Sequence, residues 1–168
     1  MMNLLANFEQ SAISVWVRET PSIFAFPFIL YLHTLGLALL AGLSVGLDVW
    51  LLSAKSRLPP ALLGGIYRLM WIGFGINLLS GLALLAAYPA KALTNWVFFL
   101  KLALVAAALW VLEQTKGELV GATGAGAATV NSRARQLAAL SLVLWGGAIF
   151  AGRLLAYTHS ILLASEGF

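Results

Sequence analysis

Apolar residues fill four long runs of the chain, and short polar stretches separate these runs. The four runs cover residues 26–52, 67–88, 95–112 and 136–163. A helix needs ~20 apolar residues to cross a hydrocarbon core ~30 Å thick, with a lower limit of ~17. Each run meets that requirement, so the pattern predicts four transmembrane helices and an all-α integral membrane protein.

The segment over residues 3–18 has a different pattern. Its apolar side chains recur at helical spacing on one face, opposite a polar face; the apolar stripe is Leu4, Phe8, Ala12 and Val15. Glu9 and Gln10 interrupt the segment and no early basic residue precedes it, which argues against a cleavable signal peptide. We therefore expect an amphipathic helix that stays in the mature protein and lies along the membrane surface.

Short connections between the four runs predict antiparallel neighbours, so we expect one domain over residues 1–168, folded as an up-down-up-down four-helix bundle. The longest connection, residues 114–135, is rich in Gly and Ala. That composition is typical of an exposed linker and predicts a flexible cytoplasmic loop.

The basic residues indicate the orientation, because Lys and Arg are retained in cytoplasmic loops. Arg18 and Lys91 fall on one side of the predicted membrane. The larger group falls on the other side and consists of Lys55, Arg57, Arg68, Lys116, Arg133 and Arg135. The second side is therefore predicted to be cytoplasmic, with both termini periplasmic in a bacterial inner membrane.

Composition excludes several classes of function. The chain is 61% hydrophobic and 10% charged, so it is neither an ordinary soluble domain nor a disordered one. It has no cysteine, which excludes disulfides, thiolate metal sites and thiol catalysis. Its net charge of +4 comes from basic residues scattered at helix ends rather than gathered in a patch, so we expect no nucleic-acid partner.

Four basic side chains fall in the predicted periplasmic half of the bundle: His33, Lys101, Arg153 and His159. An ionisable residue inside a bilayer costs ~2.5–3.5 kcal/mol on insertion scales, so it normally faces the bundle interior and has a partner. No Asp or Glu falls at the same depth in the predicted membrane. The group therefore favours an anionic or electron-rich ligand, such as haem propionates, a quinone carbonyl or a lipid phosphate.

A b-type haem is the most specific hypothesis for this group. His33 and His159 are the chain's two histidines and lie on its first and last runs, where they are candidate axial ligands of the iron. Lys101 and Arg153 would then pair with the propionates. Against this, His159 lies near the membrane edge and ~120° around the helix from Arg153.

Other interpretations of these residues stay open. His33 can be a structural imidazole hydrogen-bonded to Asn77 or to a backbone carbonyl, while Lys101 and Arg153 extend toward the headgroups.

Other chemistries have less support in the sequence. Copper handling needs soft ligands such as methionine, and Met70 is the one methionine in an apolar run, on the predicted cytoplasmic side. No carboxylate pair, Ser-His-Asp spacing or metal triad indicates hydrolysis. At most the protein is an electron-transfer subunit, and enzymatic activity is left undecided.

The first run has two distinct faces if it is one regular helix. At 100° per residue His33, Ser44 and Asp48 share one face, and Gly42 and Gly46 form a small-residue ridge on the opposite one. The ridge is a candidate for close helix packing. Asp48 with Ser44 is a candidate proton or cation site, with a pairing to Lys55 as the simpler alternative.

Four stretches resemble a family of small, uncharacterised bacterial inner-membrane proteins with four spans. They read SVWVRETPSIFAFP, GLSVGLDVWLL, WVFFLKLAL and SLVLWGGAIFAGRLLAY. The resemblance implies an inner-membrane location and marks His33, Asp48, Lys101 and Arg153 as family-type positions, but His159 is not part of the pattern. More loosely, the architecture is similar to cytochrome b membrane subunits and copper-resistance membrane proteins, which does not establish a function.

These observations predict a small inner-membrane subunit with a ligand or redox site in its periplasmic half. Haem b, for electron transfer, is the one cofactor that the residues suggest, and the cofactor is otherwise unidentified. The expected partners are membrane lipid and either another protein of a membrane complex or a second copy of the chain. The alternatives are a cofactor-free accessory or scaffold subunit, and a protein that binds quinone or lipid or handles copper.

Overall fold

The computed structural model describes residues 26–53, 59–124 and 130–165, and these residues form helices without any strand. The elements are α3 (Phe26–Leu37), a π-helical turn η1 (Ala38–Gly42), α4 (Leu43–Ser53), α5 (Pro60–Ala87), α6 (Pro89–Leu93), α7 (Trp96–Gly124) and α8 (Ser132–Ser165). Four helical segments among them are long and apolar enough to cross a membrane. The predicted all-helical class and the four apolar spans are therefore confirmed, whereas the expected helix over 3–18 lies outside the described residues.

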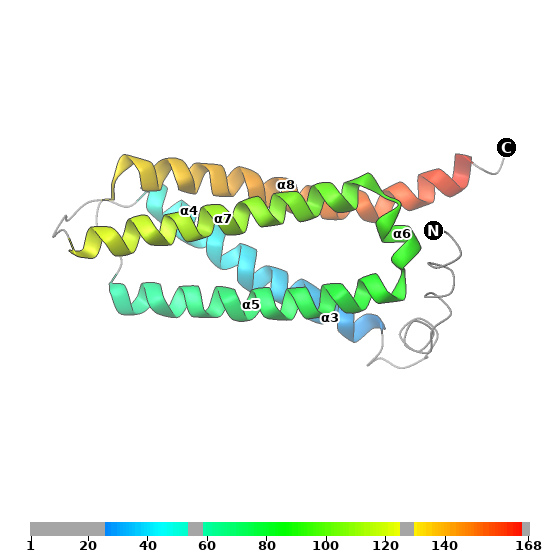
Figure 1. Cartoon of the computed structure of the whole chain (residues 1–168), viewed down its shortest axis with the longest axis horizontal. Helices are drawn as coiled ribbons and strands as arrows, with labels where there is room; N and C mark the ends of the chain where they lie inside the picture. The colour runs from blue at the N-terminus through cyan, green and yellow to red at the C-terminus, as the bar shows by residue number, and fades with distance from the viewer. Residues whose placement is uncertain (1–25, 54–58, 125–129, 166–168) are drawn as a thin grey trace.

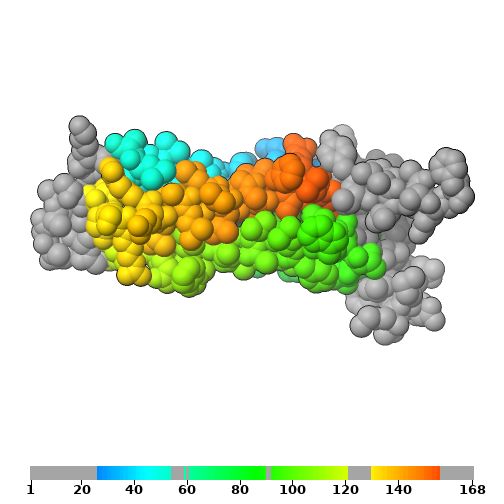
Figure 2. Space-filling view, turned by 90° about the horizontal axis from the view of Figure 1, so that it is seen from above, coloured from blue at the N-terminus to red at the C-terminus, as the bar shows by residue number. Residues whose placement is uncertain are grey.

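The first span crosses the other three obliquely (Figure 1). Its first half, α3, packs against α5, and its second half, α4, packs against α8. The most extensive contact in the described chain joins α7 and α8. Figure 2 shows α8 with α7 along one side and α4 against its N-terminal half. The first span therefore changes partner between its two ends.

The π-helical turn η1 lies at the centre of this span, where the sequence predicted a regular helix. A π-turn contains an extra residue, so it rotates the faces of the helical segments on its two sides. Gly36, before the turn, is buried against α5. Ser44 and Asp48, after the turn, are buried, and both interact with Ser141 of α8. The prediction that His33, Ser44 and Asp48 share one face is thus wrong.

Two glycines bring α3 and α5 into backbone contact. A Cβ atom built on Gly36 would lie 2.8 Å from the carbonyl oxygen of Gly73, and one on Gly73 would lie 3.0 Å from that of Gly36. Such small residues let helix backbones approach closely in a membrane. The predicted ridge of Gly42 and Gly46 makes no such contact within the described part of the chain, where nothing lies within 4 Å of a Cβ at either position.

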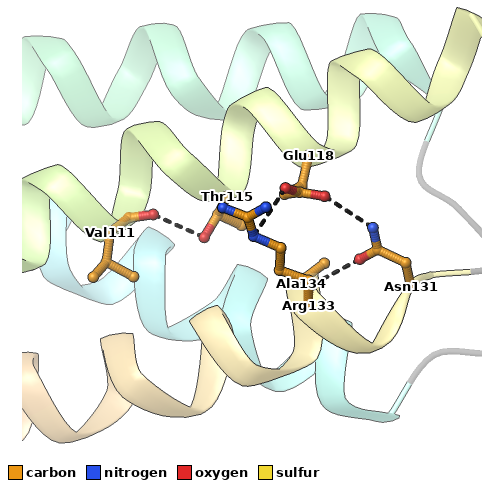
Figure 3. Close-up of polar contacts among 6 residues, drawn as sticks. All are labelled: Val111, Thr115, Glu118, Asn131, Arg133 and Ala134. Carbon is orange, nitrogen blue, oxygen red and sulfur yellow. Dashed lines mark hydrogen bonds and ion pairs between the residues drawn. The ribbon is translucent and has the colours of Figure 1, made fainter.

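The predicted loop over 114–135 is too long at both ends, because α7 continues to Gly124 and α8 already begins at Ser132. Glu118 of α7 links the two helices: its carboxylate accepts a hydrogen bond of 2.9 Å from Asn131 and pairs with Arg133 at 3.2 Å. Asn131 also accepts a 2.7 Å hydrogen bond from the N–H of Ala134, the bonding of a helix N-cap (Figure 3). Residues 114–120 include Gln114, Lys116, Glu118 and Leu119, all good helix formers, so the linker was predicted to begin too early in the chain.

Candidate functional site

His33 is fixed by α5. Its ring Nδ1 lies 3.1 Å from the carbonyl oxygen of Asn77 and 3.2 Å from the hydroxyl oxygen of Ser80. The side-chain amide of Asn77 donates a 2.8 Å hydrogen bond to the carbonyl oxygen of His33. Gly81 leaves room for the ring, because a Cβ there would lie 3.2 Å from its Cε1 atom. The hydrogen bond to Asn77 considered for a structural imidazole is therefore present.

These contacts also assign the tautomer of a neutral His33. A carbonyl oxygen only accepts hydrogen bonds, so Nδ1 must carry the proton and donate to Asn77. Nε2 then holds a lone pair, and none of the described residues hydrogen-bonds to it. Histidines that bind metals are commonly oriented in this way, with one nitrogen donating to a carbonyl and the other facing the metal.

Lys101 approaches the same region from α7. Its side chain crosses to α8, where a Cβ on Gly152 would lie 3.6 Å from Cε and 3.8 Å from Nζ. The ammonium group is close enough for its charge to act on His33. Within the described part of the chain, no carboxylate lies within ion-pair distance of this group. The Lys101 charge thus acts electrostatically on the region of His33, which favours a negatively charged or electron-rich group there.

The other two predicted site residues lie on α8, and only the side chain of Arg153 is described. Arg153 follows Gly152 directly, but its side chain is exposed. His159 belongs to the same helix, ~10 Å of helical rise beyond Gly152, and its side chain lies outside what the structure describes. His33 lies in α3, the first half of its span. The contacts of this span with α8 are made mainly by α4, at the other end.

A second buried polar cluster joins α4 to α8. Trp145 donates a 2.9 Å hydrogen bond from its indole nitrogen to the hydroxyl of Ser44, whose oxygen lies 3.5 Å from that of Ser141. Asp48 is 2% exposed and hydrogen-bonds with Ser141. Its Oδ2 atom has no hydrogen-bond partner among the described residues. The sequence indicated Ser44 and Asp48, but it gave no signal that Ser141 and Trp145 would complete the cluster.

The described residues contain no group of three or more His, Cys, Asp or Glu side chains that could hold a metal ion. Comparison of the chain with protein-family models, with curated proteins and with solved structures finds no match. The interpretation of the site therefore rests on its own geometry, above all on the orientation of His33 beside Lys101.

Proposed function

We propose that the protein is a membrane subunit that binds a b-type haem in the periplasmic half of its bundle, with Nε2 of His33 as an iron ligand. The orientation of the imidazole carries this proposal, because Nδ1–H is held by a backbone carbonyl and Nε2 keeps its lone pair. When bound, the haem would supply one-electron redox chemistry.

Lys101 has the charge that such a ligand needs. Haem propionates are anionic. An ammonium group whose charge reaches a membrane-embedded imidazole, with no carboxylate at ion-pair distance among the described residues, favours them over a neutral group. His159 is the candidate for a second iron ligand. His33 alone would also hold the haem on the same observation.

The proposed setting is a bacterial inner membrane, with the N-terminal amphipathic helix at its surface. In this proposal the four candidate spans run up-down-up-down with both termini in the periplasm, an orientation that the distribution of Lys and Arg supports. Labelling of an Arg57→Cys variant with an impermeant thiol reagent tests the orientation, since the chain has no cysteine of its own. We expect no labelling from the periplasmic side; labelling there would reverse the topology and place His33 in the cytoplasmic half.

The absorption spectrum of the full chain, purified from haem-replete cells, tests the function. We expect a Soret band and, after reduction, the visible bands of a b-type haem. A colourless preparation would contradict the haem proposal. It would leave a quinone or lipid at the His33 and Lys101 site, or a scaffold without a cofactor, as the remaining functions.

Two variants assign the ligand. His33→Ala removes the imidazole and should yield protein without the Soret band. Thr34→Ala is the matched control, because Thr34 is the next residue, is exposed, and bonds only to the carbonyl of Leu30 in its own helix among the contacts described. Equal haem content in the two variants would exclude His33 as a ligand.

A further inference from the structure

A cavity at the other end of the bundle has the chemistry of a lipid site. It has a volume of about 400 Å³ and opens between α5 and α7. Its lining consists of Leu63, Gly64, Tyr67, Arg68, Trp71, Lys116 and Val120. Gly64, Arg68, Trp71 and Val120 are exposed, so the cavity opens onto the surface of the helices that would face lipid.

Two cationic groups lie at this cavity. Nζ of Lys116 is 5.4 Å from the centre of the Tyr67 ring, which holds the ammonium over an aromatic face. Its ion pair with Glu113 is long, at 3.9 Å, and exposed, and such pairs contribute little. Arg68 has no acidic partner among the described residues. Both groups are therefore available to an added anion.

The depth of both cations fits a phospholipid headgroup. A hydrocarbon core ~30 Å thick corresponds to ~20 helical residues. Counted along α5 from its end at Ala87, the far boundary of the core falls at Tyr67 and Arg68. Counted along α7 from its start at Trp96, the boundary falls at Lys116. Two independent helices thus place their cations at the level where phosphates begin.

The apolar part of the lining fits an acyl chain. Leu63, Trp71 and Val120 provide apolar contacts, and Gly64 keeps the space open, since nothing lies within 4 Å of a Cβ built there. We propose that this cavity binds an anionic phospholipid, with Arg68 and Lys116 on its phosphate and one acyl chain along Gly64. Basic pockets between transmembrane helices on the cytoplasmic side are suited to such headgroups. The assignment does not depend on the haem proposal.

Native mass spectrometry of the full chain in a non-ionic detergent tests the site. Dioleoyl phosphatidylglycerol and dioleoyl phosphatidylcholine are added separately, since they share acyl chains and differ in headgroup charge. We expect about tenfold tighter retention of phosphatidylglycerol. Equal retention of the two lipids would overturn the proposal, and displacement of phosphatidylglycerol by an equal concentration of inorganic phosphate would assign a free-phosphate site instead.

Adjacent glycines provide a matched pair of variants. Gly64→Leu puts a side chain into the cavity and should abolish the preference for phosphatidylglycerol. Gly65→Leu adds the same side chain to the next residue, which also has open space around it but does not line the cavity, and should bind like the parent. Identical lipid retention in both variants would place the lipid elsewhere.

A second pair tests the charges. Arg68→Gln should weaken phosphatidylglycerol retention about tenfold. Arg133→Gln removes a charge from the same end of the molecule, where Arg133 pairs with Glu118 outside the cavity, and should leave retention unchanged. Equal loss in both variants would mean that general surface charge, rather than this cavity, attracts the lipid.

Discussion

His33 and Asn77 hold each other through two reciprocal hydrogen bonds, each from a side chain to the main-chain carbonyl oxygen of the other residue. The pair fixes both the position of the helix crossing and the direction of the imidazole. Only the direction of the imidazole matters for a ligand on Nε2. Ser80→Ala acts on the direction of the imidazole, whereas Gly73→Ala acts on the helix crossing.

Ser80→Ala should weaken haem binding without unfolding the helices. It removes one of the two acceptors of Nδ1–H and leaves the carbonyl of Asn77 in place. Loss of such a supporting partner typically costs a metal site 10–100-fold in affinity, so we expect about a tenfold loss in a haem titration. Ser53→Ala is the control, because this exposed hydroxyl bonds only to the backbone of its own helix among the contacts described. Equal haem affinity in both variants would show that Ser80 has no part in orienting the ring.

Gly73→Ala should destabilise the protein by about 1–3 kcal/mol, because overpacking at a tight contact forces the backbones apart. The added methyl would lie 2.7 Å from Cβ of Leu39 and 2.9 Å from the backbone nitrogen of Leu40. Thermal unfolding in detergent measures the effect. Gly42→Ala, which meets nothing within 4 Å, should unfold like the parent. Equal unfolding temperatures for Gly73→Ala and Gly42→Ala would mean that the backbones of α3 and α5 do not approach closely at Gly73.

The sequence predicted most of the fold, because four apolar runs of sufficient length determine four helices in a bilayer. It did not predict the π-turn η1, since an extra residue in one helical turn leaves no signature in an apolar run. Without that turn, the wheel put Asp48 on the His33 face and gave no reason to expect contact with Ser141. The pairing of Gly36 with Gly73 was hidden for a similar reason, because several glycine pairs have helical spacing and only the crossing angle selects one.

The candidate site was predicted in part. His33 and Lys101 were identifiable as ionisable residues within apolar runs, where each has a high cost and needs a partner. Their proximity, and the exposure of Arg153, depend on the rotation of α7 and α8 about their axes. Nearly uniform apolar composition around those helices leaves that rotation undetermined by the sequence.

Lys101→Leu and Arg153→Leu should differ in ligand content. The side chain of Lys101 crosses the interface between α7 and α8 to Gly152 and its charge acts on His33, whereas the side chain of Arg153 is exposed. We expect the first variant to lose most of its haem and the second to keep it, by pyridine haemochrome assay. Because leucine suits a bilayer, neither change should lower the unfolding temperature. Retention of haem in Lys101→Leu would assign Lys101 to the headgroup region instead.

Asp48→Asn tests the second polar cluster. A buried carboxylate without a charged partner is costly, so the neutral amide should leave the unfolding temperature unchanged or raise it. Glu113→Gln, on an exposed carboxylate paired with Lys116, should be close to neutral. A clear fall for Asp48→Asn alone would mean that its charge is compensated, by a bound cation or by a basic residue.

Native mass spectrometry of the parent beside His33→Ala is the most direct test of a ligand site at His33, because it detects any bound molecule. We expect an added mass of one haem on the parent and its absence from His33→Ala, with both chains intact and folded. Identical bound material on the parent and on His33→Ala would contradict a ligand site at His33.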